Sequence, residues 1–338
     1  MILAKPSHLS WGDQPKPIVL LVPGFAISDV LLGSKNKSRN FECTIEPVPV
    51  MQNDNDTYFL DLPRWLIEDG GFDVRIAYLE NNHNYTPSII TNALCLRQQI
   101  LNAADQSPTN DVIIIAHSMG GLVSRAYIQS QTFQEDSQQR NKPPVSKVIL
   151  VAAPNQGMPF HFWLNLILKC ESTATTQRSA CEFSSSRWIA KFNETFKEIP
   201  QGVDFYTIGG TLHNSLLGFI AGSYICLTSG PNDGTIPALS SIGFAGARGK
   251  ALYAEAHLPS VGKPSYFSEY MGRKSQAYIN CIYPVVVEGD SDGCEGNTAL
   301  VCSSLQNLII LILGMFILPS IIISILINQY FCSFNNAF

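Results

Sequence analysis

The chain has 338 residues, 22 Lys+Arg, 27 Asp+Glu and a formal net charge of −5. Only 14% of the residues are charged and 46% are hydrophobic, which excludes a disordered chain. A negative net charge without clusters of Lys and Arg argues against a nucleic-acid partner. The charges are also unevenly placed, because Glu295 is the last of them and residues 296–338 contain no Asp, Glu, Lys, Arg or His.

Short apolar runs alternate with helical patterns along most of the chain. Residues 18–22 (IVLLV) form an apolar run between Pro17 and Pro23, which predicts a buried parallel strand. Apolar residues at helical spacing predict an amphipathic helix over residues 88–104. Further strands are expected at residues 74–79, 112–115, 148–151, 203–208 and 251–254. This alternation predicts an α/β fold with a mostly parallel central sheet and helices on both faces.

The other segments define the expected organisation of the chain. Residues 157–202 interrupt the alternation and are rich in aromatic residues, so we expect an inserted lid within a main domain of residues 1–280. Residues 281–306, rich in Gly, Asp, Ser and Cys, predict a stalk. Residues 307–327 are 21 almost unbroken apolar residues, and roughly 20 suffice to cross a bilayer as a helix. We therefore expect a transmembrane helix there and a short tail at 328–338, with a glycolipid-anchor signal as the rival interpretation.

Cysteines and sequons indicate an oxidising compartment. The chain has nine cysteines, among which Cys170/Cys181 and Cys294/Cys302 are candidate disulfides, with buried free thiols as the alternative. Four N-x-S/T sequons favour the same compartment: Asn36, Asn55, Asn84 and Asn193. Residues 1–17 lack the apolar stretch of a secretory signal, which leaves a tail anchor with a cytosolic body, a missing N-terminal segment and unconventional export open.

These observations predict a membrane protein with a single C-terminal anchor. We expect its body to be lumenal or extracellular. Its orientation stays open, because no Lys or Arg flanks the C-terminal side of the span.

The most informative segment follows the strand at 112–115 and reads AHSMGGLV. Ser118 has small residues two positions before and after it, Ala116 and Gly120, and an amphipathic helix follows. A serine on a strained strand-to-helix turn needs this pattern, because bulky neighbours at those positions would clash. The helix N-terminus supplies N–H groups to a developing oxyanion. The pattern predicts a nucleophile, and the alternative is a plain turn with an exposed serine.

Four motifs together resemble the lipase branch of the α/β-hydrolase superfamily, over roughly residues 15–260. They are AHSMGGLV, the upstream LLVPGF, AAPNQG after the next strand and the later NDGTIP. The resemblance implies the α/β-hydrolase fold and a Ser–His–Asp serine hydrolase that acts on an ester, often of a lipid. Ala116 departs from the usual G-x-S-x-G but keeps the side chain small.

The serine needs a histidine as base, held by a carboxylate, and in this fold the chain order is serine, acid, histidine. Position along the chain leaves His257, which directly follows a short strand, and removes the other five histidines: His8, His83, His117, His161 and His213. Asp233 lies in a turn-forming segment and matches the D-G-x-[VI] context of the acid in lipases that resemble this chain. Asp204 and Glu255 are the weaker alternatives.

The oxyanion hole requires two backbone N–H groups. Met119, the residue after the nucleophile, supplies one. By resemblance to the H-G-x loop of lipases, Phe25 supplies the other, with Pro23 where many relatives have His. No metal or organic cofactor is required, and Asp54 and Asp56 are better explained as a solvated loop than as a Ca²⁺ site.

The sequence therefore predicts a serine ester hydrolase that cleaves carboxylic esters, with lipids as the expected substrates, through a triad and an acyl-enzyme. Its expected partners are a lipid or ester substrate and the membrane that holds the C-terminal helix. Two alternatives stay open: an acyltransferase or lipid-remodelling hydrolase of the same fold, and a non-catalytic, membrane-tethered binding module.

Overall fold

The computed structural model describes residues 15–24, 45–50, 58–79, 86–158, 178–211, 225–226, 228–257, 275–290 and 292–297, together with the single residues Cys43 and Cys170. The strands are β1 (Ile18–Val22), β2 (Val48–Pro49), β3 (Val74–Ile76), β4 (Val112–His117), β5 (Val145–Val151), β6 (Asp204–Gly210), β7 (Gly249–Tyr253) and β8 (Glu295–Asn297). The helices are α2 (Leu62–Glu68), α3 (Ile89–Gln106), α4 (Met119–Ile128), α5 (Gln131–Arg140), α7 (Arg178–Ser184), α8 (Ser186–Thr195), α10 (Ala238–Ile242) and the π-helix η2 (Tyr278–Glu288).

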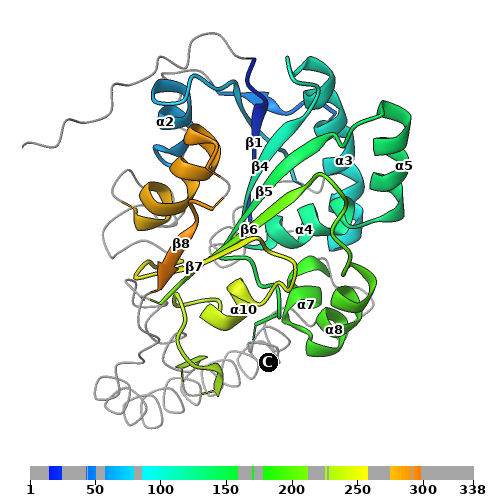
Figure 1. Ribbon diagram of the computed structural model, residues 1–338. Coiled ribbons are helices and arrows are strands. Elements are labelled where there is room, and N and C mark those ends of the chain that lie inside the picture. The colour runs from blue at the N-terminus through cyan, green and yellow to red at the C-terminus, as the bar shows by residue number, and fades with distance from the viewer. Residues whose placement is uncertain are drawn as a thin grey trace, which may run out of the picture.

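The strands form one sheet in the order β2-β3-β1-β4-β5-β6-β7-β8. The strand pairs are parallel except β2 with β3, which is antiparallel. The two central strands β1 and β4 are buried at every residue, because helices cover both faces of the sheet (Figure 1). The expected mostly parallel sheet with helices on both faces is confirmed.

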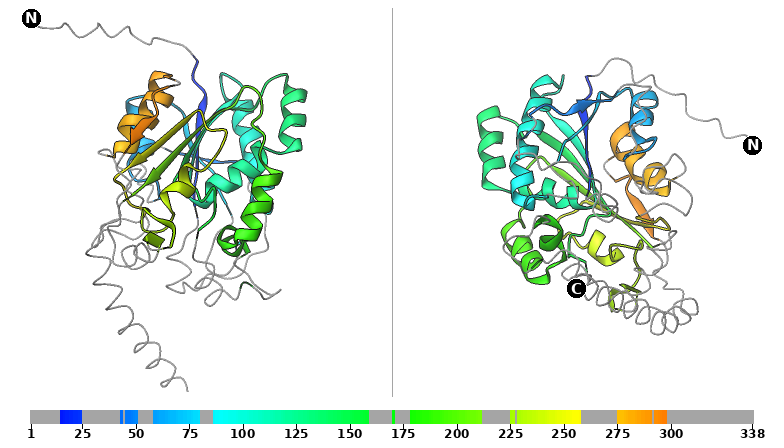
Figure 2. Two further views of the ribbon diagram at one scale, coloured as in Figure 1. Left: turned by 60° about the horizontal axis from the view of Figure 1, so that its bottom comes forward. Right: turned by 180° about the vertical axis from the view of Figure 1, so that it is seen from behind.

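Each central strand sends alternate side chains into two separate cores. Leu20 and Ile114 join the core under α3, α4 and α5, whereas Leu21 and Ile115 join the core under α2 and η2. Figure 2 shows these two helical layers on opposite sides of the sheet. A strand buried on both faces has no polar positions to spare, which explains the uninterrupted IVLLV and VIII runs.

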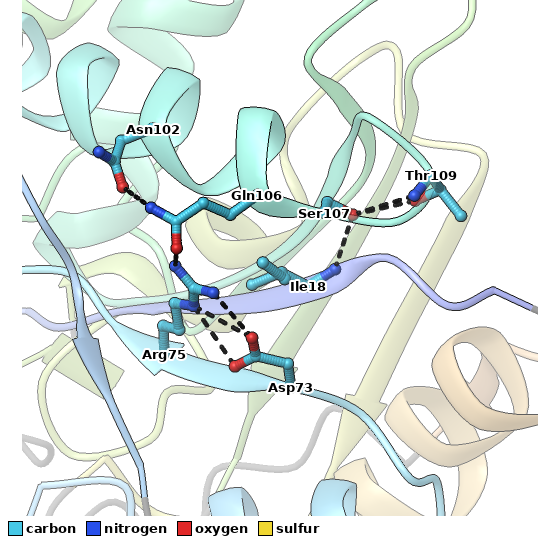
Figure 3. A network of polar contacts seen from close by, with 7 residues as sticks. All are labelled: Ile18, Asp73, Arg75, Asn102, Gln106, Ser107 and Thr109. Carbon is cyan, nitrogen blue, oxygen red and sulfur yellow. Dashed lines mark hydrogen bonds and ion pairs between the residues drawn. The ribbon is translucent and has the colours of Figure 1, made fainter.

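A polar network fastens the C-terminal end of α3 to the starts of β1 and β3 (Figure 3). Arg75 on β3 donates to Asp73 at 2.8 Å and to the side-chain oxygen of Gln106 at 2.7 Å. The Ser107 hydroxyl accepts from the backbone N–H of Ile18 at 3.3 Å. These contacts lie where the parallel strands begin, so the opposite edge, where they end, is the edge available to a site.

Two predicted boundaries shift for identifiable reasons. β3 ends at Ile76 rather than at residue 79, because Tyr78 leaves the sheet and exchanges two hydrogen bonds of 2.8 Å with the side chain of Gln99 on α3. The helix expected at 88–104 is α3, and Ser88 caps it by accepting from Thr91 N at 3.0 Å.

The predicted stalk over residues 281–306 is wrong in its described part. Residues 278–288 form η2, which buries Cys281, Ile282 and Val285 against the sheet, and β8 pairs in parallel with β7. A composition rich in Gly and Asp indicated an exposed linker, but a few apolar side chains on one helix face hold the segment on the core. The main domain therefore extends past residue 280, at least to Asn297.

Disulfides join the described segments at three places: Cys43–Cys95, Cys170–Cys181 and Cys281–Cys294. Cys226 is disulfide-bonded as well. The pair Cys170/Cys181 is confirmed. The pair Cys294/Cys302 is wrong, because η2 brings Cys281 within a Cα–Cα distance of 4.0 Å of Cys294.

No helix among the described ranges is long and apolar enough to cross a membrane. The predicted span at 307–327 and the tail at 328–338 lie outside those ranges. Residues 159–169 and 171–177 of the predicted lid lie outside them too.

Candidate active site

Ser118 lies on the turn that joins the end of β4 to the start of α4. Its backbone has φ 53° and ψ −126°, a region that costs a non-glycine residue free energy. The turn is held by Ser118 N–H donating to Val151 O at 2.9 Å and by Gly121 N–H donating to Ser118 O at 3.0 Å. The strained strand-to-helix turn expected from the sequence is therefore present.

Close approach of the backbone explains the glycines around this turn. A Cβ on Gly120 would overlap the carbonyl oxygen of Pro23. A Cβ on Gly24 would lie 2.7 Å from the Cβ of Ser118. The Pro23–Gly24 segment after β1 consequently lies directly against the serine.

The structure brings Ser118, His257 and Asp233 together at the edge where β4, β6 and β7 end. His257 Nε2 is 3.1 Å from Ser118 Oγ, and His257 Nδ1 is 2.9 Å from Asp233 Oδ2. Asp233 is 1% exposed and His257 is 7% exposed. A buried carboxylate can only accept, so Nδ1 carries the proton and Nε2 presents its lone pair to the serine hydroxyl.

The turn around Asp233 fixes the direction of its carboxylate. Asp233 Oδ1 accepts from Thr235 N at 3.0 Å and from Ile236 N at 2.7 Å. The His257 N–H donates to Asp233 O at 2.8 Å, which joins the two loops through the backbone as well. With Oδ1 occupied by the turn, Oδ2 is the oxygen that faces the imidazole.

The two alternative acids are engaged elsewhere. Asp204 lies at the start of β6, at the opposite edge of the sheet, and pairs with Arg248 at 3.4 Å. Glu255 Oε1 accepts from the backbone N–H of Ala277 at 3.1 Å, at the start of the η2 segment. The geometry thus favours Asp233 over both.

One of the two expected oxyanion donors can be placed. Met119 directly follows Ser118, is buried and begins α4, so its N–H belongs to the positive end of that helix. Phe25 lies outside the described residues, and its role stays a prediction. Its neighbour Gly24 is described, and the Gly24 N–H donates to the hydroxyl of Tyr58 at 2.5 Å.

Sequence reasoning missed two residues beside the triad. The Tyr58 hydroxyl also contacts His117 Nδ1 at 2.8 Å, and the His117 ring lies 4.7 Å from the His257 ring between centroids, with 34° between the planes. Burial, and then the charge of His257, hold the pKa of His117 well below its usual value. No motif carries Tyr58, and His117 occupies the variable position of the elbow, so no sequence signal singled out either.

A buried arginine connects α4 to α8, which lies within the residues predicted as a lid. Arg125 is 1% exposed and donates to Gln129 at 2.9 Å, Asn155 at 3.1 Å and Asn193 at 2.9 Å. Its guanidinium lies 5.1 Å from the ring centroid of Phe192 on α8. Burial lowers the pKa of Arg125 to about 9. Because these acceptors are neutral, the contact clamps α8 onto the core without a salt bridge.

A cleft of about 340 Å³ lies between the segment after β5 and the start of α10. Its walls are Gln156, Gly157, Met158, Ser186, Ser229, Pro237, Leu239 and Ser240. It begins next to the turn that carries Asp233. Among the described residues, no group of three or more His, Cys, Asp or Glu side chains is placed to hold a metal ion.

Comparison with known proteins finds one family model and several solved structures that are similar to this chain. The model of the PGAP1-like alpha/beta domain family matches residues 68–214. No curated relative matches the chain at a significant level. Similar solved structures include the mature Bacillus licheniformis lipase BlEst2, with 15% identity and a TM-score of 0.48 over 72% of this chain and 86% of that chain. They also include the metagenomic carboxyl esterase MGS0156, with 14% identity and a TM-score of 0.48 over 87% and 78% of the two chains. The chain is an α/β-hydrolase-fold protein in which residues 68–214 match the PGAP1-like alpha/beta domain.

Proposed function

We propose that the protein is a serine hydrolase of carboxylic esters, with Ser118 as nucleophile, His257 as base and Asp233 as the carboxylate that orients the base. One observation carries this proposal: the His257 imidazole bridges Ser118 Oγ and Asp233 Oδ2 at 3.1 and 2.9 Å. Ser118 itself lies on a strained turn at the carboxyl end of β4. A serine, a base and a buried carboxylate in this chain of contacts form the arrangement that activates a serine hydroxyl.

The reaction follows from the direction of each hydrogen bond. His257 Nε2 removes the Ser118 proton as Oγ attacks the ester carbonyl carbon, and the imidazolium that forms is stabilised by Asp233. The carbonyl oxygen becomes an oxyanion, for which the Met119 N–H and the expected Phe25 N–H are the donors. His257 then protonates the leaving alcohol, and a water activated by the same base releases the acid from the acyl-enzyme.

We further propose that the substrate is a lipid ester and that residues 307–327 hold the enzyme at a membrane, with the main domain on the lumenal or extracellular side. The apolar 307–327 segment supports the membrane anchor, and together with the aromatic composition of 157–202 it supports a lipid substrate. The disulfides Cys43–Cys95, Cys170–Cys181 and Cys281–Cys294 support an oxidising compartment. Alkaline carbonate extraction of the full chain tests the anchor, and protease protection of sealed microsomes tests the side.

The proposed chemistry is tested with purified full-length protein in detergent. A fluorophosphonate probe is expected to label the wild type and the control Ser137→Ala, in which a serine of α5 is replaced, but not Ser118→Ala. A panel from nitrophenyl butyrate to long-chain glycerides and phospholipids then defines the acyl and headgroup classes. An acyltransferase would instead pass the acyl group to an added alcohol faster than to water, and a binding module would neither label nor turn over.

A further inference from the structure

The hydroxyl group of Tyr58 joins the segment after β1 to the turn after β4. The Tyr58 hydroxyl accepts from Gly24 N–H at 2.5 Å and contacts His117 Nδ1 at 2.8 Å. Gly24 directly precedes the expected oxyanion donor Phe25, and His117 directly precedes the nucleophile Ser118. Tyr58 thus bridges the loop after β1 and the turn after β4, which come from different parts of the chain.

The first hydrogen bond has a fixed direction, and the tautomer of His117 sets the direction of the second. The Gly24 amide can only donate, so the phenol oxygen is its acceptor. His117 is neutral in its buried setting, and a neutral imidazole has one nitrogen that accepts. In the tautomer with an unprotonated Nδ1, the Tyr58 hydroxyl donates to His117, which gives a continuous chain from the Gly24 N–H through the Tyr58 O–H to the imidazole.

The far end of this chain reaches the base. The His117 ring faces His257 at 4.7 Å between centroids and is only 34° from parallel to it. Fixing the His117 ring therefore restricts the position of the His257 ring that packs beside it. A displacement of a few tenths of an ångström at either end would misplace an oxyanion donor or the base, and misplaced groups cost rate rather than substrate affinity.

We propose that Tyr58 is a positioning residue that holds the oxyanion loop at Gly24 and the elbow at His117 in register through its hydroxyl. This inference rests on the proposed hydrolase function and adds a group to it. Tyr58 is half-buried, and its ring packs on Phe59 at 4.8 Å between centroids. Phenylalanine at this position keeps the ring and removes only the bridge.

The test compares kcat and KM for nitrophenyl butyrate and the rate of fluorophosphonate labelling. The variants are Tyr58→Phe, His117→Asn, His117→Leu and the double variant Tyr58→Phe/His117→Leu, with Tyr78→Phe as matched control because the Tyr78 side chain is 46% exposed and its backbone, rather than its hydroxyl, contacts Gln99. Asparagine places an acceptor oxygen near the position of Nδ1, whereas leucine keeps bulk without an acceptor.

Tyr58→Phe is expected to lower kcat and the labelling rate about tenfold, with KM within about twofold and an unchanged thermal midpoint, as the loss of one buried hydrogen bond to a reacting unit implies. His117→Asn should retain at least about threefold more kcat than His117→Leu, and the double variant should lose less than the product of the two single losses.

An active wild type in which Tyr58→Phe matches Tyr78→Phe would overturn the role of Tyr58 and leave the hydrolase intact. Equal losses in His117→Asn and His117→Leu would assign His117 to packing and overturn the bridge. Both proposals would be overturned if the wild type does not hydrolyse the ester and the Ser118→Ala variant is still labelled by the probe.

Discussion

Replacing Asp233 with asparagine tests the proposed base, because the turn around residue 233 fixes which side-chain atom would face His257. The side-chain oxygen of asparagine would stay at the Oδ1 position, because Thr235 N and Ile236 N donate there at 3.0 and 2.7 Å. The amide nitrogen must then replace Oδ2, 2.9 Å from His257 Nδ1. That nitrogen can only donate, so Nδ1 has to accept and the ring proton moves to Nε2.

In this tautomer Nε2 points its N–H at Ser118 Oγ, 3.1 Å away, and cannot take the serine proton. The same tautomer error in a Ser–His–Asp triad costs about 10⁴ in kcat, which is about 5 kcal/mol of transition-state free energy at about 1.36 kcal/mol per factor of ten. We expect a loss of that size in kcat for nitrophenyl butyrate at about pH 7.5, with little change in KM or in the unfolding midpoint.

The alternative acids supply the controls. Asp204→Asn and Glu255→Gln should each keep kcat within a few-fold of the wild type, since Asp204 pairs with Arg248 at the opposite edge and a glutamine oxygen can still accept from Ala277 N. An Asp233→Asn variant that keeps more than a tenth of the wild-type kcat would refute the assignment, as would a larger loss in Glu255→Gln.

Three further outcomes follow from the packing. Burial raises the pKa of Glu182 to about 7 from 4.5. Because the folded pKa exceeds the unfolded one, the free energy of unfolding falls as the pH rises from about 4.5 through 7. Glu182→Gln should remove up to ~3 kcal/mol of this loss and raise the melting temperature at about pH 8 but not at about pH 4. Gly120→Ala places a methyl group on the Pro23 carbonyl oxygen and should destabilise the fold by about 1–3 kcal/mol in urea titrations, whereas an unchanged midpoint would mean that the loop yields. Cys281→Ser with Cys294→Ser opens a link with a sequence separation of 13 and should cost about 3 kcal/mol relative to the oxidised wild type in urea titrations, whereas an unchanged midpoint would mean that this link does not stabilise the fold.

Local patterns sufficed for the sheet and the elbow. The runs at 18–22 and 112–115 are apolar at every position, and the structure buries both strands completely. Ser118, Asp233 and His257 each follow a strand, and a parallel sheet places all such ends along one edge. Their meeting could therefore be expected from chain order and turn chemistry, without any knowledge of distances.

Long-range packing set the limits of sequence reasoning. Tyr58 reaches Gly24 and His117 across separations of 34 and 59 residues, and neither separation has a local signature. The Gly, Asp and Ser of residues 281–306 taken as a whole predict a stalk, but residues 278–288 are mostly apolar (YINCIYPVVVE), and the structure places Cys281, Ile282 and Val285 in the core. The partner of Cys294 depended on the same misplaced segment.

The segment beyond His257 has a closer connection to the proposed chemistry than its composition suggested. His257 follows β7, which has two neighbours in the sheet: β6, whose following segment carries Asp233, and β8 on the outer side. β8 is held by Cys294, which is bonded to Cys281 on η2. Glu255, two residues before His257, also accepts from Ala277 N at the start of the η2 segment. The segment that carries His257 is therefore supported from both sides of β7, so the described residues 275–290 and 292–297 belong to the same domain as the proposed site.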